Sequence, residues 1–345
     1  MSLDKGVERK MKSIIMFMPY YGKLPGYFDI WLSAIGMNSS IDFCLITDLI
    51  SDSNNLPTNA KLINISFEEF KNRIQSHFDF DISIDNLGRI SQFRPALGYC
   101  FPEIIDGYDY WGFIECDLIP GNIRNFITDE ILENNDKIFK LGHFQIFKNN
   151  EQMNRLFMQE YKSALSYRFA FSKNILFFEE LIGMHNIAQA EGVKTYTENV
   201  FSDVKASELC FIRSQYAYPD VPQGFHCLYE YIDGNLYEYS FDGKKLNKRE
   251  VLYAHFQKRD MDVCTRDFNK YLIIPNKFVD YQEVNESFFD IVDLNIAPIA
   301  ENYMDKKKVG FIKARKNRYR QLCWWQLTFL RKKIRNHGGI DLDGK

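Results

Sequence analysis

The sequence has no apolar run near the roughly 18–20 residues that a membrane-spanning helix requires. It also lacks an apolar core of the signal-peptide kind before Pro19, so we expect neither a spanning segment nor a secretory leader. The seven cysteines are scattered and include no pair separated by two residues, which argues against a zinc module and a disulfide scaffold. These absences favour a protein of the reducing cytoplasm.

Glycine-rich phosphate motifs are absent as well. Neither the P-loop pattern nor the GxGxxG pattern occurs, and Gly22 and Gly26 alone do not form a phosphate loop. A nucleotide site in this chain would therefore not depend on a glycine-rich phosphate loop.

Hydrophobic residues make up 46% of the 345 residues and aromatic residues 16%, so the chain can bury a large core and is not disordered. The net charge of -3 conceals a split. Residues 306–337 contain twelve Lys or Arg and no acid, whereas the remainder carries 31 basic and 46 acidic residues. This asymmetry indicates an anionic partner for the tail.

The most informative segment begins with a buried strand over 110–114, apolar on both faces, which predicts a sheet covered on both sides. Glu115 and Asp117 follow the strand, and Pro120-Gly121 forms a turn. Ligands of α/β proteins bind at the carboxyl ends of strands, and carboxylates there suit a divalent cation with phosphate oxygens. The alternative is an acidic surface turn without a ligand.

The rest of the chain alternates strands and helices, which predicts an α/β fold with a mostly parallel sheet. Predicted strands lie at 13–18, 42–47, 61–65, 137–141, 144–147, 193–196 and 250–259, and a hairpin at 229–239 turns at Asp233-Gly234. Predicted helices lie at 27–37, 67–78, 101–103, 125–134, 151–167 and in the stretch before Gly192. Residues 79–91 are expected to be a loop, and Arg94 to be extended because proline follows it.

Further polar side chains could complete a site with Glu115 and Asp117. His255 ends a predicted strand next to Lys258 and Arg259, and Glu179-Glu180 enters a predicted helix. A cation held by two carboxylates and an imidazole would neutralise a diphosphate, which Lys258 and Arg94 could stabilise as it leaves. Each residue also has a structural alternative: a satisfied buried histidine, acids at a helix N-terminus, or a solvated basic turn.

These blocks together resemble a family. Trp111-Gly-Phe-Ile-Glu-Cys-Asp-Leu-Ile-Pro-Gly121 resembles the DxD region of GT-A-fold glycosyltransferases, in particular a bacterial capsule and O-antigen group with the pattern WGxxDxDxxxG. Tyr253-Ala-His255-Phe-Gln-Lys258-Arg259 resembles the late HxQKR block of that group. Four further blocks follow the same order within 12–279: Thr47-Asp48, Arg94-Pro95-Ala-Leu-Gly98, Gly142-His143 and Phe178-Glu179-Glu180. The sequence departs from the pattern at Glu115, where the group has aspartate.

The resemblance implies a transferase that uses a UDP-hexose and Mn²⁺ or Mg²⁺. It implies Asp117 and His255 as metal ligands and Glu115 as a metal or nucleotide contact. Because glutamate is one methylene longer than aspartate, direct ligation by Glu115 is less secure than by Asp117. Further roles carried over are a uracil or ribose contact for Asp48, a diphosphate contact for Lys258 and, if the enzyme inverts the configuration, the acceptor base for Glu180 or, second, Glu179.

The basic tail at 306–337 is expected to be a helix with an apolar stripe, and Trp324 and Trp325 flank that stripe. Indole rings and Lys or Arg side chains suit an anionic membrane surface. A helix packed on the body is the alternative, and the acidic body disfavours nucleic acid.

We therefore expect a GT-A-like domain at 12–279, its mostly parallel mixed sheet covered by helices on both faces, then a linker at 280–305 and the helical tail. The expected function is hexosyl transfer from a nucleotide sugar to a glycan at the cytoplasmic face of the membrane, and we expect the glycan to be lipid-linked. Alternatives are a nucleotidyl or phosphoryl transferase acting on a sugar phosphate, and a membrane-associated module that binds nucleotide sugars without turnover.

Overall fold

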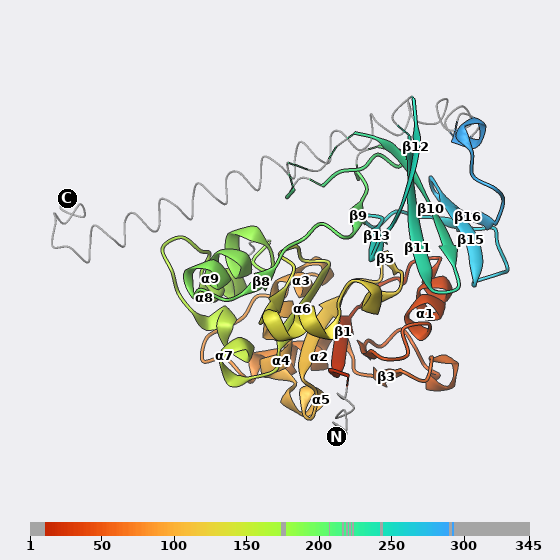
Figure 1. The fold of residues 1–345 in the computed structure, drawn as a ribbon. Coiled ribbons are helices and arrows are strands. Elements are labelled where there is room, and N and C mark those ends of the chain that lie inside the picture. Colours follow the sequence, from red (N-terminus) through yellow and green to blue (C-terminus); the bar gives the residue numbers. More distant parts are fainter. Residues whose placement is uncertain are drawn as a thin grey trace, which may run out of the picture.

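The fold is organised around a seven-stranded mixed sheet (Figure 1). The computed structural model describes residues 11–289 except 174–176, 207, 216, 219, 221, 223 and 242–243, and also residue 292. In sheet order the strands are β3 (Ala60–Ile63), β2 (Asp42–Ile46), β1 (Ile14–Pro19), β4 (Tyr110–Ile114), β7 (Phe144–Lys148), β6 (Lys137–Ile138) and β8 (Thr195–Tyr196). Only the two pairings of β7 are antiparallel, so the predicted mostly parallel sheet of an α/β fold is confirmed.

Both faces of this sheet are buried, as the apolar strands predict. Ile15 and Phe17 of β1 point into one core, and Met16 and Met18 into another. Helices cover the first face: α2 (Phe67–Gln75), α3 (Ile90–Phe93), α4 (Leu97–Cys100), α5 (Pro102–Ile105), α7 (Glu151–Asn154), α8 (Tyr167–Ser172) and α9 (Asn186–Ala190). The second face is covered by α1 (Phe28–Gly36), α6 (Asp129–Asn134) and the inner side of a second sheet.

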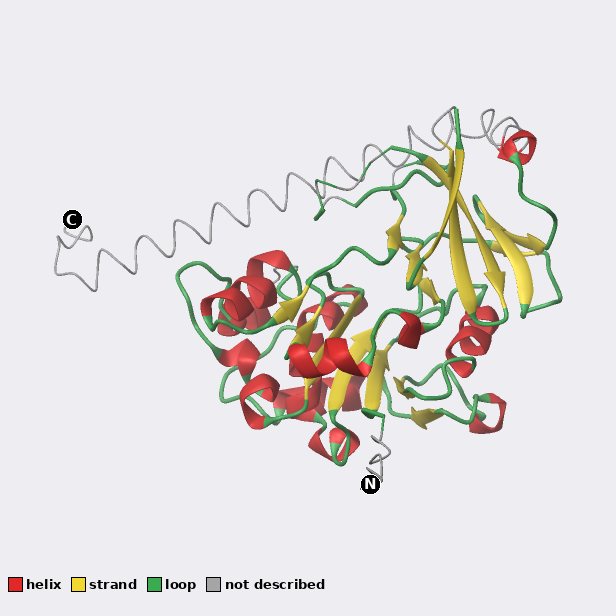
Figure 2. Cartoon of the chain, in the orientation of Figure 1, coloured by secondary structure: helices red, strands yellow, loops and turns green. Residues whose placement is uncertain are grey.

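That second sheet has six strands and lies beside α1 (Figure 2). Its order is β12 (Leu246–Glu250), β11 (Asn235–Phe241), β10 (His226–Ile232), β15 (Lys270–Ile274), β16 (Lys277–Asp280) and β14 (Asp262–Val263). The predicted hairpin is confirmed: β10 and β11 pair around Asp233 and Gly234, both with positive φ, as this turn requires. The sequence predicted the hairpin but not the sheet that it belongs to.

A third, small sheet connects distant parts of the chain next to the acidic segment. Its strands are β5 (Leu118–Pro120), β13 (Tyr253–His255) and β9 (Ser202–Asp203), with β13 in the middle. His255 pairs with Leu118 on one side and with Asp203 on the other. This register determines which side chains meet at the site.

Helix α4 lies against β4 because Gly98 lets it approach. A Cβ built on Gly98 would lie 2.3 Å from the Trp111 ring, so no other residue fits there without a shift. The Trp111 indole donates to Asn154 Oδ1 at 2.7 Å, which ties the same strand to α7.

Three local predictions were wrong. Arg94 is not extended but helical (φ -53°, ψ -41°), because Pro95 sits at the start of a 3₁₀ turn, where a missing N–H costs nothing. The predicted helix at 151–167 is interrupted: α7 ends at Asn154, a 3₁₀ turn at Leu156–Met158 buries Leu156 and Phe157 in the core, and α8 does not begin until Tyr167. Residues 79–91, expected to be a loop, include a 3₁₀ turn at Leu87–Arg89 and the first residues of α3.

Beyond Asp280, Phe289 is buried against Leu228 and Tyr239 of the second sheet. Most of the predicted linker at 280–305 and the whole predicted tail at 306–337 lie outside the described residues. In the part of the chain that is described, no helix has both the length and the apolar character to cross a membrane.

Candidate metal and diphosphate site

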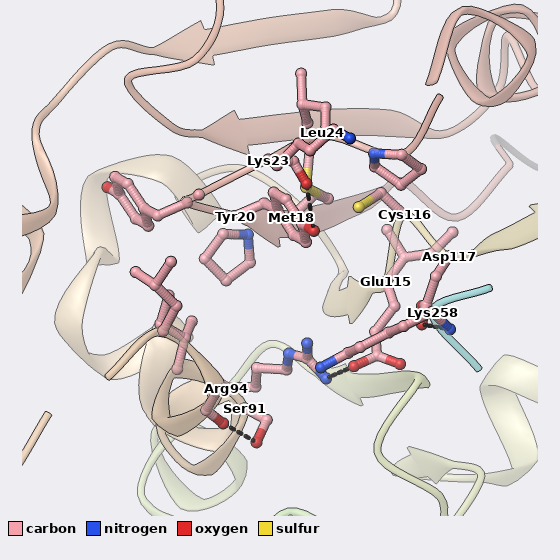
Figure 3. A pocket seen from close by; sticks show the side chains of 18 of the residues that line it. Met18, Tyr20, Lys23, Leu24, Ser91, Arg94, Glu115, Cys116, Asp117 and Lys258 are labelled. Atoms are coloured by element: carbon pink, nitrogen blue, oxygen red, sulfur yellow. Dashed lines mark hydrogen bonds and ion pairs between the residues drawn. The ribbon is translucent and has the colours of Figure 1, made fainter. Parts of the chain in front are cut away.

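The acidic segment lies where the chain leaves the large sheet. β4 ends at Ile114, Glu115 and Asp117 follow, and β5 begins at Leu118. The neighbouring strand β1 runs parallel to β4, so its loop opens at the same edge of the sheet. Between the two loops and α3 is a pocket of about 310 Å³ (Figure 3). It is lined by residues of 18–27, of 87–94, of 114–117 and of 258–260, Glu115, Asp117, Arg94 and Lys258 among them.

His255 joins the two carboxylates because β13 pairs with β5. Its Nε2 atom lies 3.4 Å from Glu115 Oε2 and 3.6 Å from Asp117 Oδ1. One ligand atom from each of the three side chains lies within 4.8 Å of the other two. The structure thus brings together the three predicted metal ligands, which are up to 140 residues apart in sequence.

Asp203, which no sequence pattern indicated, faces the other nitrogen of the same ring. Asp203 Oδ1 lies 3.1 Å from His255 Nδ1 and also accepts a hydrogen bond from Gln257 Nε2 at 2.7 Å. Its strand β9 has only two residues, too short for any hydrophobic alternation to reveal it. Only the pairing of β9 with β13 gives Asp203 its place.

Two consecutive residues with left-handed backbone follow His255. Gln257 and Lys258 both have φ of 57°, a conformation that is unfavourable for residues with a Cβ. The turn directs the Lys258 N–H to Asp117 Oδ2 at 2.8 Å. It also leaves the Lys258 side chain at the pocket, beside Asp117 (Figure 3). Lys258 is therefore placed to contact both the acidic segment and a ligand.

Arg94 reaches the same segment from the opposite side of the pocket. Its Nη1 atom lies 2.6 Å from Glu115 Oε1 and donates to Gly142 O at 3.0 Å. The guanidinium is buried apart from its edge on the pocket. Although the predicted conformation of Arg94 was wrong, its helical turn still places the side chain at the site.

The charges of these groups support one another. Burial opposes ionisation of Glu115, but the attraction of Arg94 and His255 outweighs it and holds the pKa of Glu115 well below its usual range. Burial likewise opposes a charge on His255, but Asp117 and Asp203 raise its pKa well above the ordinary value. The carboxylates therefore stabilise a positive charge on His255, and a cation bound at its Nε2 atom would take the place of the proton there.

A second group of possible ligands, His143, Asp203 and His255, shares one histidine with the first. The rings of His143 and His255 are stacked, with centroids 4.4 Å apart and planes at 23°. Because a ring nitrogen binds a metal in the plane of its ring, nearly parallel rings do not point their nitrogens at one ion. His143 also contacts the Tyr253 hydroxyl through Nδ1 at 2.9 Å, and burial lowers its pKa to about 4. The first group is the better metal site.

Glu179 and Glu180 lie next to this site but do not line the pocket. A Cβ on Gly142 would lie 2.7 Å from Glu179 Cγ and 3.1 Å from Glu180 Cγ, so both side chains pack against that glycine. Glu179 is 4% exposed, and its Oε2 atom has no hydrogen-bond partner among the described residues. Burial raises the pKa of Glu179, although Arg94 partly offsets this.

Asp48 and Arg259, the other residues considered for the site, do not contact the acidic segment in the same way as Arg94 and Lys258. Asp48 is exposed after β2 and is not among the pocket-lining residues, but its charge is one cause, after burial, of the raised pKa of Tyr21, which does line the pocket. Arg259 is 3% exposed and donates to the carbonyls of Lys205 at 2.7 Å and Leu209 at 2.9 Å. Arg259 thus fastens the loop after β9 and is a structural residue.

The model of DUF6625, a family of unknown function, matches residues 16–282, and no curated protein matches the sequence. Three solved structures give weak likenesses. The galactosyltransferase LgtC, in complex with donor and acceptor sugar analogs, is 12% identical over 56% of this chain and 75% of its own, with a TM-score of 0.33.

Mouse xyloside xylosyltransferase 1 in its apo form is 9% identical over 55% of this chain and 87% of its own, with a TM-score of 0.35. The apo-form glycosyltransferase GlyE of Streptococcus pneumoniae TIGR4 is 11% identical over 55% of this chain and 46% of its own, with a TM-score of 0.30. Scores this low carry no conclusion about function.

Proposed function

This chain belongs to DUF6625, a family of unknown function, and we propose that it is a GT-A-like, metal-dependent glycosyltransferase that moves a hexose from a nucleotide sugar to a glycan. A UDP-sugar is the favoured donor. The observation that carries the proposal is the meeting of His255 with Glu115 and Asp117, two carboxylates that line the same pocket as Arg94 and Lys258. Two cationic side chains beside a cation site suit a diphosphate.

The three ligands fit Mn²⁺ or Mg²⁺. Two ligand atoms at right angles around such an ion, each about 2.1 Å from it, lie about 3 Å apart. The His255 Nε2 atom is 3.4 Å from Glu115 and 3.6 Å from Asp117, close to that separation. Carboxylate oxygens suit Mg²⁺ and Mn²⁺, and an imidazole favours Mn²⁺ over Mg²⁺. The bound ion would supply positive charge for the departing diphosphate.

The other residues of the site are proposed to bind the donor and to take part in the transfer. Arg94 and Lys258 bind the diphosphate oxygens, and Asp48 is proposed to contact the uracil or ribose. In the transfer step the bond from the anomeric carbon to the diphosphate oxygen breaks, and its electron pair leaves with the diphosphate. The acceptor oxygen forms the new bond to that carbon, and its proton passes to a base.

We assign that base to Glu180, with Glu179 as the second candidate, for an enzyme that inverts the configuration. Both side chains lie against Gly142, whose carbonyl accepts from Arg94, so they are close to the diphosphate side of the site. Glu180 is the less buried of the two and so the more accessible to an acceptor, whereas burial raises the pKa of Glu179, which makes that carboxylate the stronger proton acceptor.

The proposals for the acceptor and for the cellular location rest on the sequence alone. The twelve basic residues and two tryptophans of 306–337 suit an anionic membrane surface, and we propose a lipid-linked glycan acceptor on its cytoplasmic face, in synthesis of a capsule or O-antigen. Deletion after Asp305 should then reduce co-sedimentation with anionic vesicles and spare turnover of soluble substrates. Unchanged vesicle binding would remove the tail from the proposal.

A donor panel tests the function. Purified protein is incubated with UDP-, GDP-, ADP- and dTDP-sugars in Mn²⁺, Mg²⁺ or a chelator, and the released nucleotides are separated. We expect metal-dependent release of UDP from one UDP-hexose. Release of nucleoside monophosphate or of pyrophosphate would indicate phosphoryl or nucleotidyl transfer instead, and binding without any release would indicate a non-catalytic module.

A further inference from the structure

Asp203 is buried behind His255, on the side away from the pocket. It is 1% exposed, and its Oδ1 atom lies 3.1 Å from His255 Nδ1 and accepts a hydrogen bond from Gln257 Nε2 at 2.7 Å. Its backbone is fixed as well, because β9 pairs with β13 in the register Asp203 to His255 and Asp203 O accepts from Ser214 N at 2.8 Å. The carboxylate cannot move without moving the small sheet.

We propose that Asp203 is a positioning residue that holds the His255 ring with Nδ1–H donating to it and Nε2 presented to the cation between Glu115 and Asp117. This role rests on the proposed function. Asp203 itself touches neither the ion nor the donor.

The geometry gives each nitrogen of His255 one task. A hydrogen bond from Nδ1 to a carboxylate fixes the tautomer in which Nε2 carries the free electron pair when the ring is neutral. The negative charge of the partner also makes Nε2 a stronger ligand. Gln257 reinforces the arrangement, because its donation to the same oxygen keeps Oδ1 turned toward the ring.

A purely structural role is the competing explanation, since a buried histidine and carboxylate also stabilise a fold. The two explanations differ in what they predict for metal affinity. A positioning residue changes the affinity of a ligand that it does not touch, typically about 10- to 100-fold. A structural residue changes the stability of the protein and leaves the affinity of the folded fraction unchanged.

The test uses two variants and a matched control in the full chain. Asp203→Ala removes the acceptor, and Asp203→Asn keeps an acceptor of the same shape without the charge. Glu230→Gln also removes a buried negative charge, because Glu230 is 1% exposed, but its partner is Lys248 on the second sheet. The affinity for Mn²⁺ alone is measured from the free-ion electron paramagnetic resonance signal, and thermal unfolding confirms that each variant is folded.

We expect Mn²⁺ affinity about 10- to 100-fold lower in Asp203→Ala, an intermediate loss in Asp203→Asn and wild-type affinity in Glu230→Gln. A second measurement does not need the metal. In protein labelled with [¹⁵N]histidine, the Nδ1–H of His255 should give a downfield, hydrogen-bonded resonance, assigned by its absence in His255→Gln and lost in Asp203→Ala.

The outcomes separate this role from the function. If wild type binds Mn²⁺ and folded Asp203→Ala binds it equally well, the positioning role is wrong and the proposed function stands. Absence of the hydrogen-bonded resonance from wild type also overturns the role. If wild type shows the resonance but binds no Mn²⁺, the metal-dependent function fails, and the positioning role fails with it.

Discussion

Arg94 Nη1 lies 2.6 Å from Glu115 Oε1, and both side chains are largely buried, with exposed fractions of 10% and 16%. The same Nη1 donates to Gly142 O at 3.0 Å. Arg94 therefore connects the acidic segment after β4 with the turn against which Glu179 and Glu180 pack. A single guanidinium links the proposed donor side of the site to the proposed base.

Replacement of Arg94 tests this link. Arg94→Met leaves Glu115 charged and without its main partner, and loss of one member of a buried ion pair costs about 3–5 kcal/mol. The unfolding free energy should fall by about that much, and nucleotide-sugar affinity should fall as well. In the double variant Arg94→Met, Glu115→Gln the stability should partly recover while the affinity stays low. Urea unfolding measures the stability and calorimetry the nucleotide-sugar affinity. If the double variant loses as much stability as the two single variants together, Arg94 and Glu115 do not interact directly.

Gly142 offers a way to move the two glutamates without removing them. In Gly142→Ala the new methyl group would lie 2.7 Å from Glu179 Cγ and 3.1 Å from Glu180 Cγ, so both side chains must shift. We expect sugar transfer to fall at least tenfold while Mn²⁺ affinity changes little. The control is Gly107→Ala, where φ is +78° but nothing lies within 4 Å of an added Cβ. That variant should lose some stability and keep full transfer.

The identity of the base is tested by Glu180→Gln and Glu179→Gln. The amide keeps the shape of each side chain but cannot accept the acceptor proton. We expect Glu180→Gln to reduce transfer by about 10²- to 10⁴-fold, with donor affinity unchanged. Glu179→Gln should retain most of the activity. The reverse order would assign the base to Glu179, and full activity in both would refute a carboxylate base at this position.

Lys137 makes stability depend on pH. It is fully buried in β6 and donates to Phe139 O, and burial lowers its pKa to about 7 from an ordinary value of 10.5. Between these values the unfolded chain binds more protons than the folded one, so the Lys137 contribution to the unfolding free energy rises with pH, by at most about 1.4 kcal/mol per unit.

Lys137→Met removes this dependence. The variant should be more stable than wild type near neutral pH, and the difference should shrink as the pH is raised toward 10.5. Urea unfolding of both proteins across this range measures the difference, in which other titrating groups cancel. A difference that does not change with pH would show that the folded protein keeps Lys137 protonated.

Much of the site was predictable because its residues follow strong local patterns. The buried strand before Glu115 predicted the sheet edge, and His255 stands at the end of a strand followed by two basic residues. Asp203 was missed because its strand is two residues long, and because its partner is set by tertiary pairing with β13. Neither propensity nor periodicity carries that information.

The errors in the fold have a similar origin. Arg94 was expected to be extended from the general preference of residues before proline, but its bonds to Glu115 and Gly142 stabilise a helical turn. The six-stranded sheet was only partly predicted, because β10 pairs with β15 across 38 residues of sequence. The long helix expected at 151–167 is divided into α7, a 3₁₀ turn and α8, because Leu156 and Phe157 are buried in the core at that turn.

The most direct test of the account is the binding of UDP to wild type and to Asp117→Asn by calorimetry, with Mn²⁺ and with a chelator. Asparagine can still accept the Lys258 N–H that Asp117 now accepts at 2.8 Å, so the variant should fold normally. We predict that wild type binds UDP only with Mn²⁺, and that Asp117→Asn binds at least tenfold more weakly, a loss of about 1.4 kcal/mol or more. Equal affinity in the two proteins, or UDP binding by wild type that does not depend on the metal, would contradict a metal site at Asp117 that binds the donor.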